Sequence, residues 1–195
     1  MTMTDSREET RVFSDKVIVE EKVDGSQLVF LVSETNGTLN IVTKKGTEVK
    51  VDDRDFAPAV KEIGKMAGHV RHGWIYIVEF LRGLQHNKIM YNEVPRKGLM
   101  LVDVTMKDNS FLNRQTREKE AKRLGIECLP LLWEPTDHEK ELTSYILVDL
   151  FREPAYLGGL LVPGLIVKEN VGERTWNSLN IPRGTDISVW ARNRK

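Results

Sequence analysis

Short apolar runs separated by polar turns are the feature that most constrains the fold of this chain. They lie at residues 16–21, 27–32, 39–43, 74–80, 98–104 and 164–168, with a further candidate at 186–192. Runs of this length, rich in β-branched residues, are typical of strands. The runs at 27–32 and 39–43 flank Asn36-Gly37, which predicts a hairpin.

Apolar residues recur at helical spacing in three segments, residues 56–66, 113–124 and 139–151. The predicted strands outnumber these helices, and few strands alternate with helices along the chain. We therefore predict an α+β fold with mainly antiparallel sheets flanked by helices.

The composition excludes several classes of protein. The chain has 195 residues, of which 40% are hydrophobic, and 29 basic residues balance 29 acidic ones. This apolar content argues against a disordered chain, and the single cysteine, Cys128, excludes a disulfide scaffold. Zero net charge argues against binding nucleic acid by bulk charge, so a nucleic-acid site would need local positive charge.

Residues 20–26 are the segment most suggestive of chemistry. Lys22 lies at the end of a predicted strand and is followed by Asp24 and Gly25. A lysine on such a corner can serve as a nucleophile. An ordinary exposed hairpin turn would have the same pattern, so this segment alone is only suggestive.

Three predicted apolar strands each contain one charged residue, namely Glu79, Asp103 and Lys168. A charge in an apolar strand needs a partner, because burying it unpaired is costly. One interpretation is that these side chains line a cleft for a phosphate ester and a metal. The other is that they point to solvent from a half-exposed sheet.

The order of the short motifs resembles that of the covalent nucleotidyltransferases, the superfamily of DNA ligases, RNA ligases and mRNA capping enzymes. Residues 21–25, 43–46, 77–80, 102–104 and 164–168 resemble motifs I, Ia, III, IIIa and IV, in that order. The resemblance covers about residues 16–168. It implies the adenylation-domain fold of ATP-dependent ligases, with a central nucleotide cleft.

Within that superfamily, three segments look like phage-type RNA ligases: residues 86–95, 124–130 and 157–159. Two departures stand beside this likeness. Pro163 occupies the place of the glutamate that normally begins motif IV, so a metal-binding carboxylate is missing there. A clear Lys-x-Lys motif V is also absent from residues 187–195.

The resemblance implies an ATP-dependent RNA ligase. Lys22 would take AMP from ATP as a lysyl-AMP, the AMP would pass to an RNA 5′-phosphate, and a 3′-hydroxyl would displace it. Asp24 and Glu79 would also hold Mg²⁺, with Mn²⁺ as a substitute. The residues that would bind the nucleotide are Glu21, Asp24, Gly25, Lys44, Glu79, Asp103 and Lys168.

The expected partner is nucleic acid, either RNA ends or a nicked duplex, gripped by Arg192, Arg194 and Lys195. Residues 107–123 form a second basic run, which more commonly means a solvated helix face. We expect a monomer with a flexible leader at residues 1–14 and a single adenylation domain at residues 15–195, with no separate C-terminal domain. No apolar run is long enough to span a membrane, so we expect the cytoplasm, or the host cytoplasm if the chain is phage-encoded.

Two alternatives stay open. The first is a DNA ligase or an mRNA capping guanylyltransferase of the same superfamily, although residues 86–95 favour RNA ligase. The second is a degenerate protein of this fold that binds nucleotide or RNA without sealing. Pro163 and the missing motif V favour the second alternative.

Overall fold

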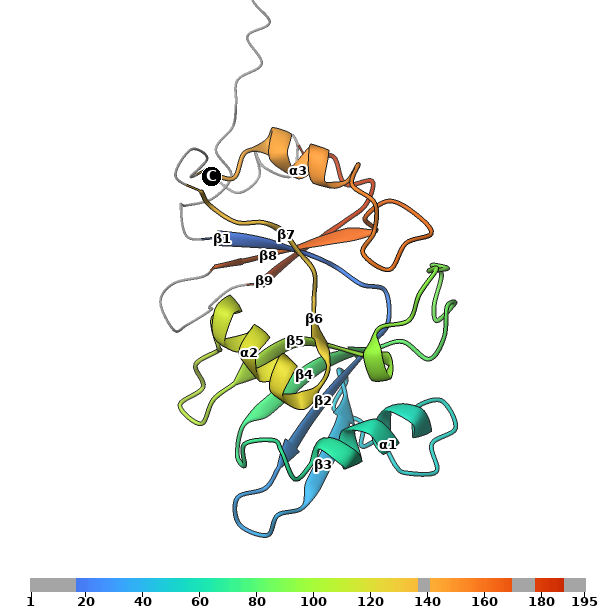
Figure 1. The fold of residues 1–195 in the computed structure, drawn as a ribbon, viewed down its shortest axis with the longest axis vertical. Coiled ribbons are helices and arrows are strands. Elements are labelled where there is room, and N and C mark those ends of the chain that lie inside the picture. The colour runs from blue at the N-terminus through green and yellow to red at the C-terminus, as the bar shows by residue number, and fades with distance from the viewer. Residues whose placement is uncertain (1–16, 137–140, 170–177, 188–195) are drawn as a thin grey trace, which may run out of the picture.

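The computed structural model describes residues 17–136, 141–169 and 178–187, which form two β-sheets stacked one above the other (Figure 1). The lower sheet has the strand order β3 (Leu39–Thr43), β2 (Ser26–Val32), β4 (Ile75–Phe80), β5 (Leu99–Thr105) and β6 (Glu127–Cys128). The upper sheet has the order β7 (Leu131–Trp133), β1 (Val17–Glu21), β8 (Gly164–Glu169) and β9 (Ser178–Pro182). All neighbouring strands are antiparallel except β5 and β6, which are parallel. The predicted α+β class with mainly antiparallel sheets is confirmed.

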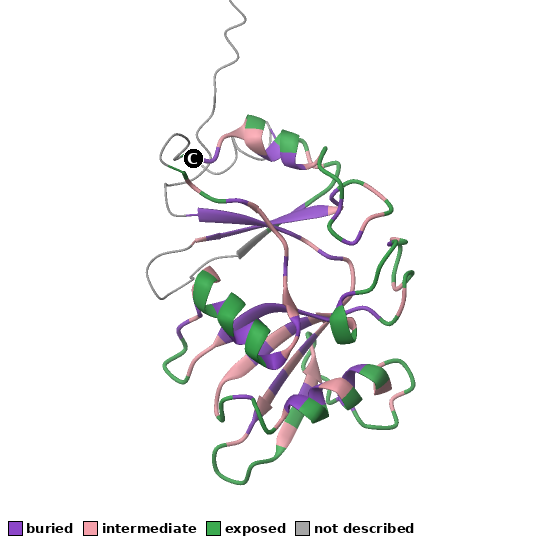
Figure 2. Ribbon diagram, viewed as in Figure 1, coloured by how far each residue is buried: buried purple, intermediate pink, exposed green. Residues whose placement is uncertain are grey.

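Helices cover the outer faces of both sheets. The helices α1 (Ala57–Met66) and α2 (Arg114–Leu124) pack on the lower sheet, and α3 (Ser144–Leu150) packs on the upper sheet (Figure 1). A single turn of 3₁₀ helix, η1 (Arg96–Gly98), precedes β5. The surfaces of these α-helices that face away from the sheets are largely exposed (Figure 2). Within the described residues, we find no helix that combines the length and apolar character needed to cross a membrane.

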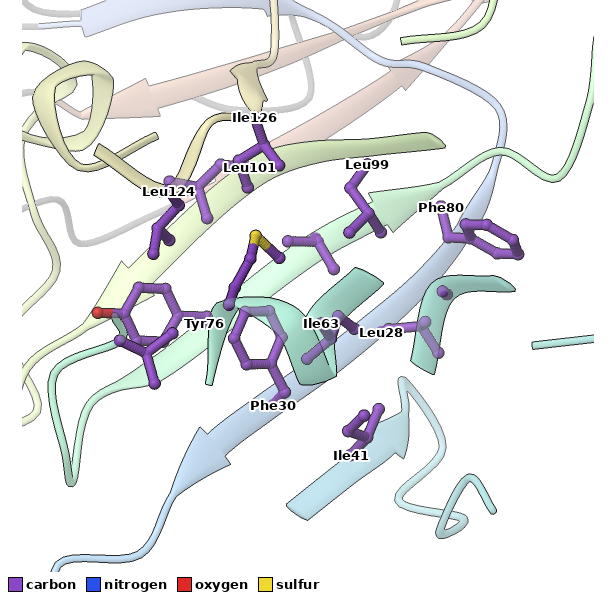
Figure 3. Close-up of a cluster of buried hydrophobic side chains, with 14 of the residues drawn as sticks. Leu28, Phe30, Ile41, Ile63, Tyr76, Phe80, Leu99, Leu101, Leu124 and Ile126 are labelled. Atoms are coloured by element: carbon purple, nitrogen blue, oxygen red, sulfur yellow. The ribbon is translucent and has the colours of Figure 1, made fainter. Parts of the chain in front are cut away.

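Alternation along the strands divides the interior into layers. In β2 and β4, the residues Leu28, Phe30, Tyr76, Val78 and Phe80 join the core beneath α1 and α2 (Figure 3). Since successive side chains of a strand point to opposite faces, the residues between them point toward the other sheet. The space between the two sheets therefore receives a second set of side chains, and the candidate site lies there.

Local sequence signals explain where two helices begin and end. Asn113 caps α2, because its side chain accepts a hydrogen bond from Thr116 N–H at 2.8 Å, and Gly125 ends the helix in the left-handed conformation. The prediction of a helix at 113–124 is confirmed. The third helix is shorter than the predicted 139–151, because Thr143 caps it and α3 begins only at Ser144.

The hairpin predicted around Asn36-Gly37 is confirmed, with β2 and β3 antiparallel and Gly37 at a φ of +68°. The last predicted strand is wrong at its start, because Asp186 and Ile187 are not in a strand, and residues 188–192 lie outside the described residues. The strand that follows β8 is instead β9, which pairs with β8 from Gly164 to Lys168. The leader at 1–14 also lies outside the described residues.

Candidate active site

A pocket of about 200 Å³ lies between the two sheets, where the chain leaves β1 and enters β2. Residues of both sheets form its walls, and two lysines and one glutamate supply its charges. Polar groups that converge beside apolar side chains are typical of small-molecule sites. The lining residues are Lys22, Val23, Gly25, Gln27, Lys44, Glu79, Val102, Leu129, Ile166 and Asn180.

Lys22 follows the last residue of β1, and its backbone N–H donates to the carbonyl of Gly164 at 2.9 Å. A Cβ atom on Gly164 would lie 3.2 Å from Cβ and 3.3 Å from Cδ of Lys22. A side chain at position 164 would therefore require Lys22 to shift by a few tenths of an ångström. The glycine at the start of β8 leaves room for the Lys22 side chain where it now lies.

Glu79 reaches the same pocket from β4. Its Oε1 accepts a hydrogen bond from Gly25 N–H at 3.0 Å, which ties the turn after Lys22 to the lower sheet. Burial raises the pKa of Glu79 to about 7, although Lys22 and the Gly25 N–H favour its charged form. Near neutral pH this carboxyl group therefore exists in both protonation states.

Lys44 lies in a tight turn that follows β3. Its backbone N–H donates to the carbonyl of Gln27 at 3.1 Å, and Thr43 N–H donates to the carbonyl of Thr47 at 2.8 Å. Gly46 has a φ of +80°, which a residue with a side chain adopts only with strain. This turn places Lys44 in the pocket wall, whereas its neighbour Lys45 is not among the lining residues.

Glu21 and Asp24 flank the pocket without lining it. Glu21 is fully buried, and its Oε2 accepts a hydrogen bond from Tyr156 N–H at 2.8 Å. Burial raises the pKa of Glu21. The backbone N–H of Asp24 donates to the hydroxyl of Tyr91 at 2.8 Å, and its carboxylate is within 3.4 Å of the Asn87 side-chain amide. Of the predicted nucleotide-binding residues, the structure thus brings Gly25, Lys44 and Glu79 together around Lys22.

Asp103 and Lys168 do not line the pocket. They belong to a buried charge cluster, defined here as Glu20, Asp103, Arg114, Arg117 and Lys168. Lys168 Nζ is 2.8 Å from Glu20 Oε2 and 3.0 Å from Asp103 Oδ2, and it donates to the carbonyl of Val102 at 2.7 Å. The buried ammonium group of Lys168 is therefore paired with two carboxylates and one carbonyl, and this side chain is part of an ion-pair network beside the pocket.

The cluster also changes the interpretation of the basic run at 107–123. Arg117 is 1% exposed and contacts Glu20. It also donates hydrogen bonds of 2.7 Å to Asp103 Oδ1 and to the Val102 carbonyl. Arg117 therefore belongs neither to a solvated helix face nor to a surface that could grip nucleic acid. Burial alone would raise the pKa of Glu20. The nearby cations Lys168, Arg117 and Arg114 outweigh this effect, so the pKa of Glu20 is lowered.

Pro163 is the motif departure that the structure describes. It precedes β8, and its carbonyl accepts a hydrogen bond from Arg183 N–H at 3.1 Å. β9 follows β8 along the chain and pairs with it; its sequence, SLNIP, contains no lysine, and its Asn180 lines the pocket. Residues 188–195 lie outside the described residues, so the absence of motif V there stays a prediction from the sequence. Arg192, Arg194 and Lys195, predicted to contact nucleic acid, lie outside the described residues.

The predicted magnesium ligands, Asp24 and Glu79, do not form a closed metal cage. Among the residues that the structure describes, no group of three His, Cys, Asp or Glu side chains could hold a metal ion. Mg²⁺ often keeps several waters and binds through one or two carboxylates plus substrate phosphates. The residues present suit a metal that arrives with a phosphorylated ligand.

Sequence reasoning missed several pocket residues, among them Gln27, Val102, Leu129 and Asn180. Gln27 is the residue that strand alternation could have found, because it precedes the buried Leu28 in β2 and must point to the opposite face. The others depend on how the two sheets stack, which no local pattern reports.

A larger hollow of about 700 Å³ lies elsewhere, between α2, β6 and residues 93–96. Its charges are mixed, with Arg96, Arg114 and Lys122 near Glu93, Glu118 and Glu127. Burial raises the pKa of the neighbouring Cys128 thiol to about 11, so the thiol stays protonated at neutral pH. Among the predicted site residues that the structure describes, none lines this hollow.

Solved structures of an RNA ligase from Naegleria gruberi have a similar fold. A mutant of that ligase with ATP and Mn has a TM-score of 0.64 and 14% identity, and the match covers 93% of this chain and 52% of that chain. The same ligase with PPi has a TM-score of 0.63 and 16% identity, with 100% of this chain and 59% of that chain covered. This chain therefore spans between half and three-fifths of the length of those structures. At this level of identity the likeness shows a shared fold.

Comparisons of the sequence itself give no match. No family model matches the chain, and no curated protein matches it either.

Proposed function

We propose that this chain is an ATP-dependent RNA ligase that acts through a covalent lysyl-AMP. The observation that carries the proposal is the convergence of Lys22, Lys44 and Glu79, which come from three separate segments of the chain, on one pocket between the sheets. These residues occupy the positions that resemble motifs I, Ia and III. The similar fold of an RNA ligase solved with ATP and Mn supports the same assignment.

In the proposed first step, Nζ of Lys22 attacks the α-phosphorus of ATP. A P–N bond forms, the P–O bond to pyrophosphate breaks, and the amine loses a proton. Lys44 would offset the negative charge that develops on the phosphoryl oxygens. A divalent metal held by the phosphates, with Asp24 or Glu79 as a protein ligand, would add positive charge at the same place.

In the later steps, an oxygen of an RNA 5′-phosphate attacks the AMP phosphorus and releases Lys22. A 3′-hydroxyl then attacks the activated 5′-phosphorus, a phosphodiester forms, and AMP leaves. The chain needs no large basic surface for this chemistry, because the reacting groups are only the two strand ends. RNA as the substrate is favoured over DNA by the segment 86–95 and by the RNA ligase fold.

A specific observation favours a second candidate function. Pro163 supplies no carboxylate, and residues 187–195 contain no Lys-x-Lys motif V. A protein that binds nucleotide or RNA in this pocket without sealing is consistent with both departures.

One experiment separates these functions. The protein is incubated with α-³²P-labelled ATP and Mg²⁺ or Mn²⁺, and denaturing electrophoresis shows whether label is bound covalently. We expect label on the wild-type protein, none on Lys22→Ala, and wild-type labelling of Lys45→Ala, whose lysine lies outside the pocket. Absence of label with ATP and GTP would favour the binding function, and label from GTP alone would favour capping chemistry. Sealing of nicked RNA, nicked DNA and single-stranded RNA then identifies the substrate.

A further inference from the structure

We infer that residues 86–91, which we call the clasp, position Lys22 by holding the turn Asp24–Ser26 that follows it. This inference rests on the proposed function for its catalytic consequence, although the holding itself is independent of that function. The clasp residues would be positioning residues, because the contacts they make are to the turn and not to the pocket.

The clasp contacts every residue of the turn. The Asn87 side-chain amide donates to the carbonyl of Gly25 at 2.8 Å, and it lies 3.4 Å from Asp24 Oδ1. His86 Nε2 and Ser26 Oγ are 2.8 Å apart. The hydroxyl of Tyr91 accepts a hydrogen bond from Asp24 N–H at 2.8 Å. The residues joined by these contacts are sixty or more positions apart in sequence, so the contacts are not a by-product of a local turn.

The protonation of His86 fixes the direction of one of these bonds. Its Nδ1 accepts a hydrogen bond from Arg82 N–H at 2.9 Å, so the neutral ring bears its proton on Nε2. Nε2–H therefore donates to Ser26 Oγ. Burial lowers the pKa of His86, which favours this neutral form. The ring is also held edge-on to Phe80, with their centroids 5.6 Å apart.

Tyr91 anchors the other end of the clasp. It is 1% exposed, and its ring packs in the layer between the sheets with Val23, Met100 and Leu157. Burial raises the pKa of Tyr91 to about 12, so its hydroxyl is uncharged and accepts the Asp24 N–H as a neutral group. Tyr91 N–H donates in turn to the carbonyl of Leu84 at 2.8 Å.

The clasp completes a set of restraints on the backbone after β1. Lys22 N–H is bonded to Gly164, Asp24 N–H to Tyr91 and Gly25 N–H to Glu79, while the Gly25 carbonyl is bonded to Asn87. Three different segments therefore hold the backbone between Lys22 and Gly25. Because a misplacement of about 1 Å can slow a reaction about 10²-fold, restraint of this turn is expected to control the rate at which Lys22 reacts.

Asn87 and Tyr91 allow the inference to be tested without breaking the core. Asn87 is exposed, so Asn87→Ala removes the bond to Gly25 without opening a cavity, and Asn87→Asp keeps the size but removes the donor. Tyr91→Phe keeps the buried ring and removes the acceptor for Asp24 N–H. Gln85→Ala is the matched control, because Gln85 is an exposed neighbour just outside the clasp.

Two measurements are made on each variant. The first is amide hydrogen exchange at Asp24 and Gly25 without nucleotide, and the second is the rate of covalent labelling at saturating ATP. We expect faster exchange at Asp24 in Tyr91→Phe. In both Asn87 variants we expect faster exchange at Gly25, because its N–H, which is bonded to Glu79, opens more often once the Gly25 carbonyl is no longer held. We expect labelling to slow by about ten- to a hundredfold while the ATP concentration for half-maximal rate changes little. Gln85→Ala should match wild type, and the thermal unfolding midpoints should stay near that of wild type.

The outcomes separate the two proposals. If the wild-type protein takes no label, the proposed ligase function is wrong. Hydrogen exchange alone then tests whether the clasp holds the turn. Unchanged exchange in the Asn87 and Tyr91 variants overturns the clasp. Wild-type labelling rates in those variants also overturn it while leaving the ligase function in place. A higher ATP concentration for half-maximal rate, with an unchanged maximal rate, would show that these residues bind ATP, which contradicts a positioning role.

Discussion

Lys168 Nζ and Glu20 Oε2 are 2.8 Å apart in the layer between the two sheets, where both side chains are almost fully buried. Glu20 comes from β1 and Lys168 from the neighbouring β8, and Arg117 adds a contact from α2. The Glu20 carboxylate therefore connects β1 to both β8 and α2. A buried ion pair of this kind is costly to break, because the remaining partner is left charged and without compensation.

We predict that Lys168→Met destabilises the protein by about 3–5 kcal/mol, because it leaves Glu20 and Asp103 with one cation fewer in the interior. The measurement is the free energy of unfolding from urea titration. Lys65→Met is the control: Lys65 pairs with Glu62 on the exposed face of α1 and should cost less than about 1 kcal/mol. Equal losses in the two variants would contradict a structural role for Lys168.

We predict that Glu79→Gln changes how stability depends on pH. The pKa of Glu79 is raised from 4.5 to about 7, so between these values the folded state holds a proton that the unfolded state has released. This group therefore stabilises the wild type most at low pH, and that contribution is lost as pH rises toward 7. Relative to wild type, Glu79→Gln should gain about 1–3 kcal/mol across this range. Urea unfolding of both proteins across the same pH range tests this, and a constant difference would contradict it.

We predict that Gly25→Ala destabilises the protein by about 1–3 kcal/mol. A Cβ atom at this position would lie 2.5 Å from the carbonyl oxygen of Phe80 and 2.9 Å from Cγ of Glu79. The backbone of β4 would have to move, which would also disturb the bond between Gly25 and Glu79. Gly64→Ala is the control in the exposed face of α1, where the new Cβ meets nothing within 4 Å. It should stabilise the helix by roughly 0.5–1 kcal/mol, and thermal or urea unfolding measures both changes.

We predict that Lys44→Ala slows covalent labelling by ATP about 10²-fold, because it removes one of the two cations that line the pocket with Glu79. Lys45→Ala removes the same charge one residue away, outside the pocket wall, and should label like wild type. Initial rates at several ATP concentrations give the comparison. Similar losses in both variants would indicate that general positive charge matters and that the position of Lys44 does not.

Much of the fold could be predicted from local patterns. The hairpin at Asn36-Gly37 and the helix between Asn113 and Gly125 depend on turn and cap residues that act on their own neighbours. The strand β9 was missed because its sequence, SLNIP, is short and contains a proline. It forms a strand through its pairing with β8, which a local sequence pattern does not indicate.

The candidate site was predicted in part. Lys22, Gly25, Lys44 and Glu79 lie around one pocket, in line with the motifs that contain them. Asp103 and Lys168 were assigned to the same pocket because a charge in an apolar strand needs a partner. The sequence could not tell which partner, since the choice between a ligand and another buried side chain depends on how the sheets and α2 are stacked.

The carbonyl of Val102 receives both Arg117 and Lys168, while its side chain forms part of the pocket wall. Two cationic side chains thus hold the backbone at Val102, directly behind the pocket wall that a ligand would contact. We expect a wall held in this way to be stiff, so that a ligand would have to match its shape closely in order to bind.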